Sequence, residues 1–133
     1  MPDDNEPKQP QQPQAQLMFK FHENFESWYA NNIQFQPTEW DLRMVFGELD
    51  FTQGIVQQHT AMTVSWLQAK LMHYFLTMQL SIYEISHGKI PVPPSVLPVE
   101  PQPPTGDLAT DPLALEMYEY MKQLRTQFLE SLK

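Results

Sequence analysis

The chain has 133 residues and is acidic, with a formal net charge of −8, thirteen prolines and no cysteine. The lack of cysteine excludes disulfides and thiolate metal sites, so we expect a reducing, cytoplasmic setting. No run of 18 or more apolar residues is present to span a bilayer, and the polar start does not resemble a secretory signal. We therefore expect a soluble protein with no membrane partner.

The acidic charge is spread along the chain. Residues 1–26 hold five acids and two bases (−3), residues 27–98 five and three (−2), and residues 99–133 six and three (−3). Nucleic-acid binders usually carry clusters of Lys and Arg that displace counterions from phosphates. The middle region has only Arg43, Lys70 and Lys89, so nucleic-acid binding is disfavoured.

Two segments precede the first predicted strand. Residues 1–16 contain four prolines and five glutamines with almost no apolar side chain. They cannot offset the entropy of ordering and are predicted to be a disordered arm.

Residues 17–26 are rich in Leu, Met and Phe at spacings that fit a strand or a helix. We therefore predict a short docking segment whose secondary structure, strand or helix, is undecided.

Residues 27–88 are predicted to form an α+β core, a three-stranded antiparallel meander packed on one long helix. Alternating apolar side chains predict strands over residues 29–35, 42–51 and 55–64. Turns are predicted at Pro37-Thr38-Glu39 and at Thr52-Gln53-Gly54. Short connections between consecutive strands favour antiparallel pairing.

The long helix is predicted to begin after Ser65, which resembles a capping-box residue with Gln68, and to end at Gly88. At 100° per residue, its apolar side chains fall on two opposite faces. The first stripe, expected to face the sheet, consists of Leu67, Leu71, Tyr74, Phe75, Met78, Ile82 and Ile85. The second stripe consists of Ala69, Met72, Leu76, Leu80 and Tyr83.

The second stripe needs a partner outside the core. Burying a large apolar side chain is worth about 1.5–3 kcal/mol, so this stripe carries about 5–10 kcal/mol, comparable with the stability of a whole domain. An ordered region of about 70 residues also has a marginal core of its own. A twofold pair of helices would cover the second stripe in both copies, so we expect a homodimer that self-associates through these five residues.

Residues 89–110 are predicted to be a stiff linker, because seven prolines lie between Lys89 and Pro104. Asp111 as N-cap and Pro112 at the first position predict an amphipathic helix over residues 111–133. Its narrow apolar seam contains Ala114, Met117, Met121, Leu124, Phe128 and Leu132. We expect a protein partner to bind Met117, Met121, Leu124 and Phe128, and packing on its own chain or on a neighbour stays open.

Short motifs in the middle of the chain resemble a known family. They are Tyr29-Ala30-Asn31, Thr38-Glu39-Trp40-Asp41-Leu42, Ala69-Lys70, and Tyr83-Glu84 before Gly88. Over about residues 27–94 they resemble a small bacterial family with the domain-of-unknown-function label 3467. The resemblance implies a compact strand-rich unit with one helix and supplies no catalytic residue. The Ser/Thr-Pro step typical of the helix start is Ser65-Trp66 here.

No group of residues predicts a reaction. The four histidines, His22, His59, His73 and His87, are scattered along the chain, and no two have the i, i+4 spacing of a metal-binding pair, so no metal or cofactor is expected. The pairs Glu39/Asp41 and Glu48/Asp50 share strand faces, as a general acid and base would, but solvated strand edges explain them.

Asparagine is depleted in strands. The pair Asn31 and Asn32 therefore favours a side-chain hydrogen bond that braces a neighbouring loop.

The sequence thus favours a non-enzymatic scaffold or adaptor that self-associates through its long helix and recruits proteins through its terminal segments. One alternative is a sheet that binds single-stranded nucleic acid through Trp28, Phe35 or Trp40 beside Arg43. The other is a small-molecule or hydrolase site that encloses Glu39, Asp41 or His59.

Overall fold

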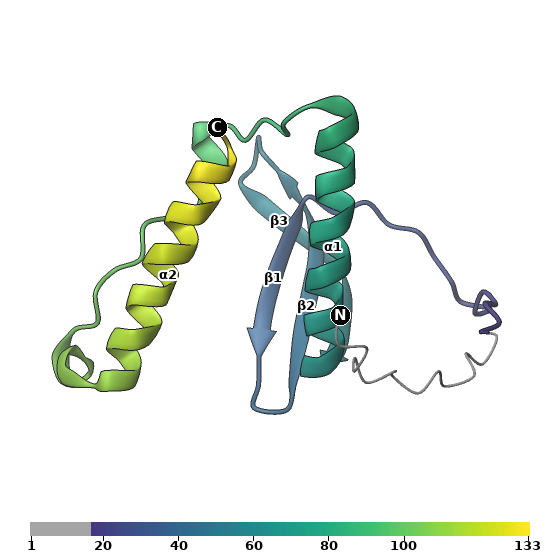
Figure 1. The fold of residues 1–133 in the computed structure, drawn as a ribbon. Helices are drawn as coiled ribbons and strands as arrows, with labels where there is room; N and C mark the ends of the chain where they lie inside the picture. Colours follow the sequence, from purple (N-terminus) through teal and green to yellow (C-terminus); the bar gives the residue numbers. More distant parts are fainter. Residues whose placement is uncertain (1–16) are drawn as a thin grey trace, which may run out of the picture. The chain divides into compact units, whose positions relative to one another are not determined.

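The computed structural model describes residues 17–133 and contains a three-stranded sheet and two long helices (Figure 1). The strands are β1 (Asn32–Pro37), β2 (Asp41–Asp50) and β3 (Ile55–Ser65). The helices are α1 (Trp66–His87) and α2 (Pro112–Ser131), with short 3₁₀ helices η1 (Pro94–Val96) and η2 (Gly106–Thr110) between them. The predicted α+β class is confirmed. The arm predicted at residues 1–16 lies outside the described residues.

The strands follow the order β1-β2-β3 in an antiparallel sheet, as expected for a meander. β1 begins three residues later than predicted, and the backbone just before it is bonded to β2 and to a side chain of β3. The Tyr29 carbonyl accepts a hydrogen bond from His59 Nε2 at 2.9 Å, and the Asn31 amide donates to the Gly47 carbonyl at 3.1 Å.

Side chains fix the first hairpin turn. The amides of Trp40 and Asp41 donate to Thr38 Oγ1 at 3.2 and 3.0 Å, and the Thr38 hydroxyl donates to the Asp41 carboxylate at 2.8 Å. Such local side-chain bonds replace the backbone ladder where the chain reverses.

The second hairpin turn is built around Asp50. Its carboxylate accepts hydrogen bonds from the Thr52 amide at 2.8 Å, the Thr52 hydroxyl at 2.5 Å and the Gln53 amide at 3.3 Å. The bonds from Thr52 hold the pKa of the Asp50 carboxyl below its ordinary value. Gly54 closes the turn with φ of 65°, a conformation that favours glycine.

The buried apolar core of the described chain is very small. Only Met44 and Val45, exposed by 5% and 8%, are buried apolar side chains among residues 17–133. Both lie on β2, and because neighbouring side chains of a strand point to opposite faces, each face of the sheet receives only one. Most of the large apolar side chains of this region are exposed.

The chain forms two compact units, whose described residues are 17–36 with 43–62, and 37–42 with 63–133. The first unit holds most of the sheet together with residues 17–26, which contain a turn and neither helix nor strand. In that turn the Phe25 amide donates to the His22 carbonyl at 2.9 Å, and the Phe21 and Phe25 rings pack with centroids 4.9 Å apart.

In the second unit, the start of α1 is tied to the first hairpin turn. The indole Nε1 of Trp66 donates to the Thr38 carbonyl at 3.1 Å. The Ser65-Trp66 sequence therefore supplies a side-chain anchor as well as a helix cap.

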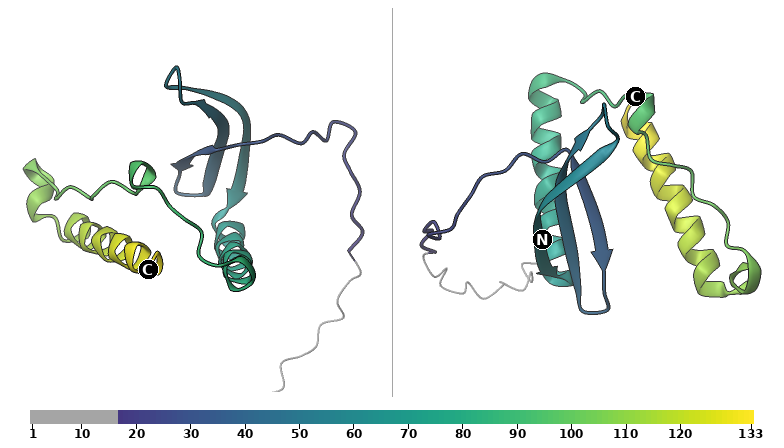
Figure 2. Two further views of the ribbon diagram at one scale, coloured as in Figure 1. Left: turned by 90° about the horizontal axis from the view of Figure 1, so that it is seen from above. Right: turned by 180° about the vertical axis from the view of Figure 1, so that it is seen from behind.

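The proline-rich segment lies along α2, as Figure 1 and Figure 2 both show. Arg125 Nε donates to the Pro98 carbonyl at 3.0 Å, and Leu97, Pro101 and Pro104 are half-buried. The sequence predicted a spacer between two units. This segment and α2 belong to the same compact unit, and the role of the segment as a spacer stays a prediction.

We predict that Gly47→Ala destabilises the sheet. A Cβ at this position would lie 2.8 Å from the Gln57 carbonyl oxygen of β3 and 2.8 Å from Val56 Cγ1, so β2 and β3 would have to separate. Overpacking of this kind costs about 1–3 kcal/mol. Chemical denaturation would show a lower unfolding midpoint than for Glu48→Ala, a change at the exposed neighbouring position. Equal midpoints for the two variants would contradict the close approach.

We also predict that Asp50→Ala lowers stability at neutral pH and less so in acid. A carboxyl whose pKa is lowered by folding stabilises the fold above its unfolded-state pKa, and this contribution is lost as the pH falls through the folded-state value. Thermal unfolding of both proteins across a pH series would therefore show a difference in Tm at pH 7 that shrinks below about pH 4. A difference independent of pH would mean that the carboxylate charge plays no part.

Candidate interaction surfaces

Both ends of α1 are capped within the chain. The Gln68 amide donates to Ser65 Oγ at 3.2 Å, as predicted, and the Gly88 amide donates to the Glu84 carbonyl at 2.9 Å. Gly88 has φ of 88°, which releases the chain from the helix. The 22 residues of α1 therefore form a rod of defined length, about 33 Å at 1.5 Å per residue.

The second stripe of α1 is open. Met72, Leu76, Leu80 and Tyr83 are exposed by 38–61%, and Ala69 is half-buried. These are the five residues predicted to self-associate.

The first stripe of α1, which we expected to be covered, is exposed as well. Its seven side chains keep between 37% and 84% of their surface. No residue of α1 is buried. An apolar helix surface of this size is typical of an interface that is completed by another chain.

Three hydroxyl groups on the flanks between the two stripes are hydrogen-bonded within the helix. The hydroxyls of Thr77, Ser81 and Ser86 donate to carbonyl oxygens one turn earlier at 2.8–3.0 Å. Such bonds cover the polar atoms of the flanks from within the helix. The flanks therefore leave the apolar stripes as the surfaces of α1 that most need a partner.

Lys70 and Glu84 are the only Lys, Arg, Asp or Glu residues of α1. The Glu84 carboxylate accepts from the Ile90 amide at 3.1 Å and from Lys89 Nζ at 3.3 Å. The Ile90 bond, followed by Lys89, holds the pKa of Glu84 below its ordinary value. No ion-pair partner within residues 17–133 is bonded to Lys70.

Helix α2 has three distinct faces and a broader apolar surface than the narrow seam predicted. One face is half-buried along the segment that contains Leu97 and Pro98, and its members are Ala114, Tyr118, Arg125, Leu129 and Leu132. Tyr118, Arg125 and Leu129 were not predicted to lie on this face, although their spacing of seven and four residues marks one helical face.

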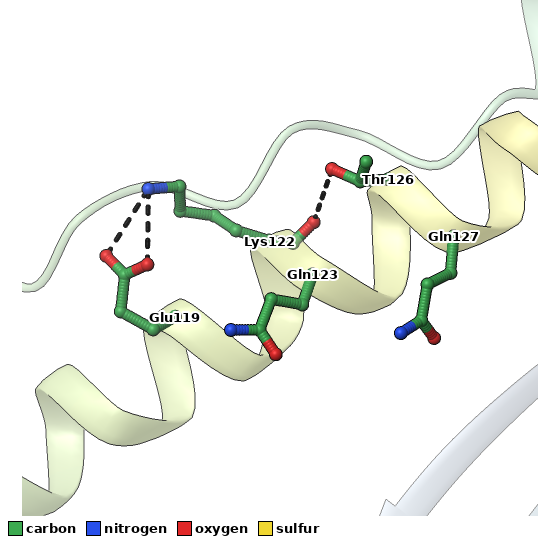
Figure 3. A pocket seen from close by; sticks show the side chains of 5 residues that line it. All are labelled: Glu119, Lys122, Gln123, Thr126 and Gln127. Carbon is green, nitrogen blue, oxygen red and sulfur yellow. Dashed lines mark hydrogen bonds and ion pairs between the residues drawn. The ribbon is translucent and has the colours of Figure 1, made fainter.

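A second face of α2 is polar. Figure 3 shows Glu119, Lys122, Gln123, Thr126 and Gln127 lining a depression of about 380 Å³. Lys122 Nζ pairs with Glu119 Oε1 at 3.3 Å, and the Thr126 hydroxyl donates to the Lys122 carbonyl at 3.0 Å. All five residues come from one solvated helix surface, so the depression has no second wall to enclose a ligand.

The third face of α2 is the open stripe, defined as Met117, Met121, Leu124 and Phe128. These side chains are exposed by 37–56%. At 100° per residue, the centre of this stripe lies roughly opposite the polar face. The four residues predicted to bind a partner are therefore brought together on one exposed surface.

Among the residues of the two alternative functions, Trp28, Asp41 and His59 have structural contacts within their own units, whereas Phe35, Trp40 and Arg43 are exposed. The Trp28 ring stacks on His59 with centroids 5.1 Å apart. Because a carbonyl can only accept, the bond to Tyr29 places the His59 proton on Nε2, which leaves Nδ1 to accept from the Thr60 hydroxyl at 2.9 Å. Asp41 belongs to a turn, while Glu39 is exposed.

The predicted asparagine brace is confirmed at Asn31. Its side-chain Oδ1 accepts from the Leu49 amide at 2.6 Å, and its Nδ2 donates to the Leu49 carbonyl at 3.4 Å. The brace holds a strand, β2, where we expected a loop.

Two kinds of feature are absent from residues 17–133, a membrane-spanning helix and a cluster of metal-binding side chains. In this range no helix is both long enough and apolar enough to cross a membrane. The same residues contain no group of three or more His, Cys, Asp or Glu arranged to hold a metal ion.

A family model described as "Protein of unknown function (DUF3467)" matches residues 1–91. The match covers more than half of the chain, so the protein belongs to this family, and the resemblance noted in the sequence is confirmed. No curated protein and no solved structure matches the chain.

Proposed function

We propose that this member of the DUF3467 family is a non-enzymatic interaction module of the bacterial cytoplasm. It assembles as a homodimer through α1 and recruits protein partners through the open stripe of α2 and the apolar residues 17–26. The observation that carries the proposal is the exposure of both apolar stripes of α1, a helix with no buried residue.

The energy of the second stripe supports self-association. Four large apolar side chains at about 1.5–3 kcal/mol each, with half of that still to be gained, offer about 3–6 kcal/mol per copy. Two copies offer about 6–12 kcal/mol, whereas association costs about 4–15 kcal/mol in lost freedom. Burial of the second stripe thus offsets most of the cost of association, and burial of other exposed apolar residues supplies the rest.

The open stripe of α2 suits recruitment of a different protein. Its residues recur at steps of four, three and four, the pattern by which an amphipathic helix fills an apolar groove. Met117 and Met121 adapt their shape to a partner more readily than branched side chains do. The segment along the neighbouring face of α2 supports the helix while leaving this stripe free.

The non-enzymatic part of the proposal is supported by two carboxylates that were candidates for a general acid or base and that instead hold the hairpin turns. Asp41 and Asp50 each accept hydrogen bonds within a hairpin turn. Groups held in this way already have a structural role.

We predict that Leu76→Glu shifts the protein from dimer to monomer. A charge in the centre of the second stripe would have to be desolvated on association, which outweighs the apolar gain. Sedimentation equilibrium at micromolar concentration measures the mass directly. The matched control is Thr77→Glu, which adds the same charge about 100° around the helix and leaves the dimer intact. A monomeric mass for the unmodified chain would refute the proposed assembly.

We predict that Met121→Glu abolishes co-purification of the protein partner from the native host and leaves the dimer mass unchanged. The matched control is Gln123→Glu, on the polar face of the same helix, which retains the partner. Quantitative mass spectrometry of tagged variants measures the loss, and a change of about tenfold or more is expected because a buried charge costs more than 1.4 kcal/mol. Equal recovery by both variants would exclude recruitment through the open stripe.

A further inference from the structure

The second stripe of α1 has a spacing that reads the same in both directions. Its residues are separated by three, four, four and three positions, with Leu76 in the middle, and α1 itself is centred between residues 76 and 77. Reversal of the helix therefore leaves the stripe unchanged. The first stripe does not have this property, because its steps read differently when reversed.

Two helices related by a twofold axis perpendicular to both of them run antiparallel. When Leu76 lies at the level of the axis, residue i of one copy faces residue 152 − i of the other. Leu76 then faces the partner's Leu76, and Met72 faces the partner's Leu80. Ala69, the smallest side chain of the stripe, faces the partner's Tyr83, the largest. Large against small is the arrangement by which facing helices interdigitate without voids.

The Tyr83 ring is held in place for that contact by a residue of its own chain. Its ring stacks on His87 with centroids 4.6 Å apart and 14° between the ring planes. His87 Nδ1 lies 3.2 Å from the Tyr83 carbonyl, which fixes the histidine over the last turn of α1. The aromatic pair forms a flat surface where the partner's Ala69 would arrive.

The charges of α1 agree with the same arrangement. Lys70 and Glu84 are 14 residues apart and lie on one flank of the helix, about 40° from each other. A perpendicular twofold axis brings that flank next to the same flank of the partner. Lys70 then lies within two residues, about 3 Å along the axis, of the level of the partner's Glu84, which a lysine side chain can span. In a parallel pair, opposite flanks of the two copies lie side by side, so Lys70 has no acidic side chain of the partner next to it.

We infer that the occupant of the second stripe is a second copy of α1, packed antiparallel about a twofold axis through Leu76. The inference rests on the proposed homodimer and adds its orientation and register. It makes the contact isologous, so each copy uses the same five residues and the assembly closes at two chains.

Disulfide trapping tests the register, because the chain has no cysteine of its own. A disulfide requires Cα atoms within about 7 Å. Leu76→Cys is expected to form a crosslinked dimer under mild oxidation. Ala69→Cys and Tyr83→Cys are each expected to stay uncrosslinked alone, since equivalent atoms lie about 21 Å apart along the axis, and to crosslink with each other when the two variants are mixed.

Thr77→Cys is the matched control, because it lies at the same level as Leu76 but about 100° around the helix; it is expected to crosslink at least tenfold more slowly. The mixed pair keeps Leu76, so it tests the register even if Leu76→Cys weakens the dimer. Non-reducing electrophoresis gives the yields, and circular dichroism confirms that each variant is folded.

Crosslinking of Ala69→Cys alone at the rate of Leu76→Cys would show a parallel pair and overturn the inference. Fast crosslinking of Met78→Cys, on the first stripe, with none at Leu76→Cys would overturn it in favour of the other face. In both cases a dimeric mass would leave the proposed function standing. A monomeric mass for the unmodified chain would instead refute the proposed function itself.

Discussion

The structure depends on one constraint, which is that a three-stranded sheet with two buried apolar side chains cannot provide a large core. Met44 and Val45 lie on opposite faces of β2, so neither face gathers the cluster of side chains that normally stabilises a domain. Helix propensity alone gives only marginal stability, and most helices in proteins are held by packing of an apolar face. In the proposed homodimer, α1, whose residues are all at least partly exposed, obtains that packing from association. Folding and assembly are then coupled, and stability depends on protein concentration.

The local devices at the ends of α1 matter because they set where the middle of the helix is. Ser65 and Gly88 stop the helix at defined residues, and Trp66 ties its first turn to the hairpin turn at Thr38. A helix with frayed ends could slide against a partner, since apolar contacts are not directional. In the proposed dimer, fixed ends combined with a stripe of mixed small and large side chains would restrict the pairing to one register. The caps therefore contribute to specificity as well as to stability.

The sequence was most informative where the deciding interactions are local. The hairpin turns, the Ser65 and Asp111 caps and the Gly88 terminus were predicted correctly because each depends on residues within a few positions of one another. The start of β1 was misplaced because Tyr29 is bonded to His59, thirty residues away. The proline-rich segment was predicted to be a spacer from its composition, which indicates stiffness but not what the segment lies against, and its role as a spacer stays a prediction. The residues on the second stripe and on the open stripe were found from periodicity, and their roles in binding stay predictions.

The segment along α2 gives the C-terminal helix a property that an isolated amphipathic helix lacks. A free helix with one apolar seam can rotate to present that seam to any apolar surface, including the core of its own protein. In α2, the hydrogen bond from Arg125 to the Pro98 carbonyl holds one face against the chain, and the polar face at Glu119 and Lys122 prefers water. Rotation about the helix axis would break the first and bury the second, each at a cost of about 1–3 kcal/mol. The open stripe is consequently the apolar face of α2 that stays exposed, and its orientation relative to residues 97–110 is fixed within the chain.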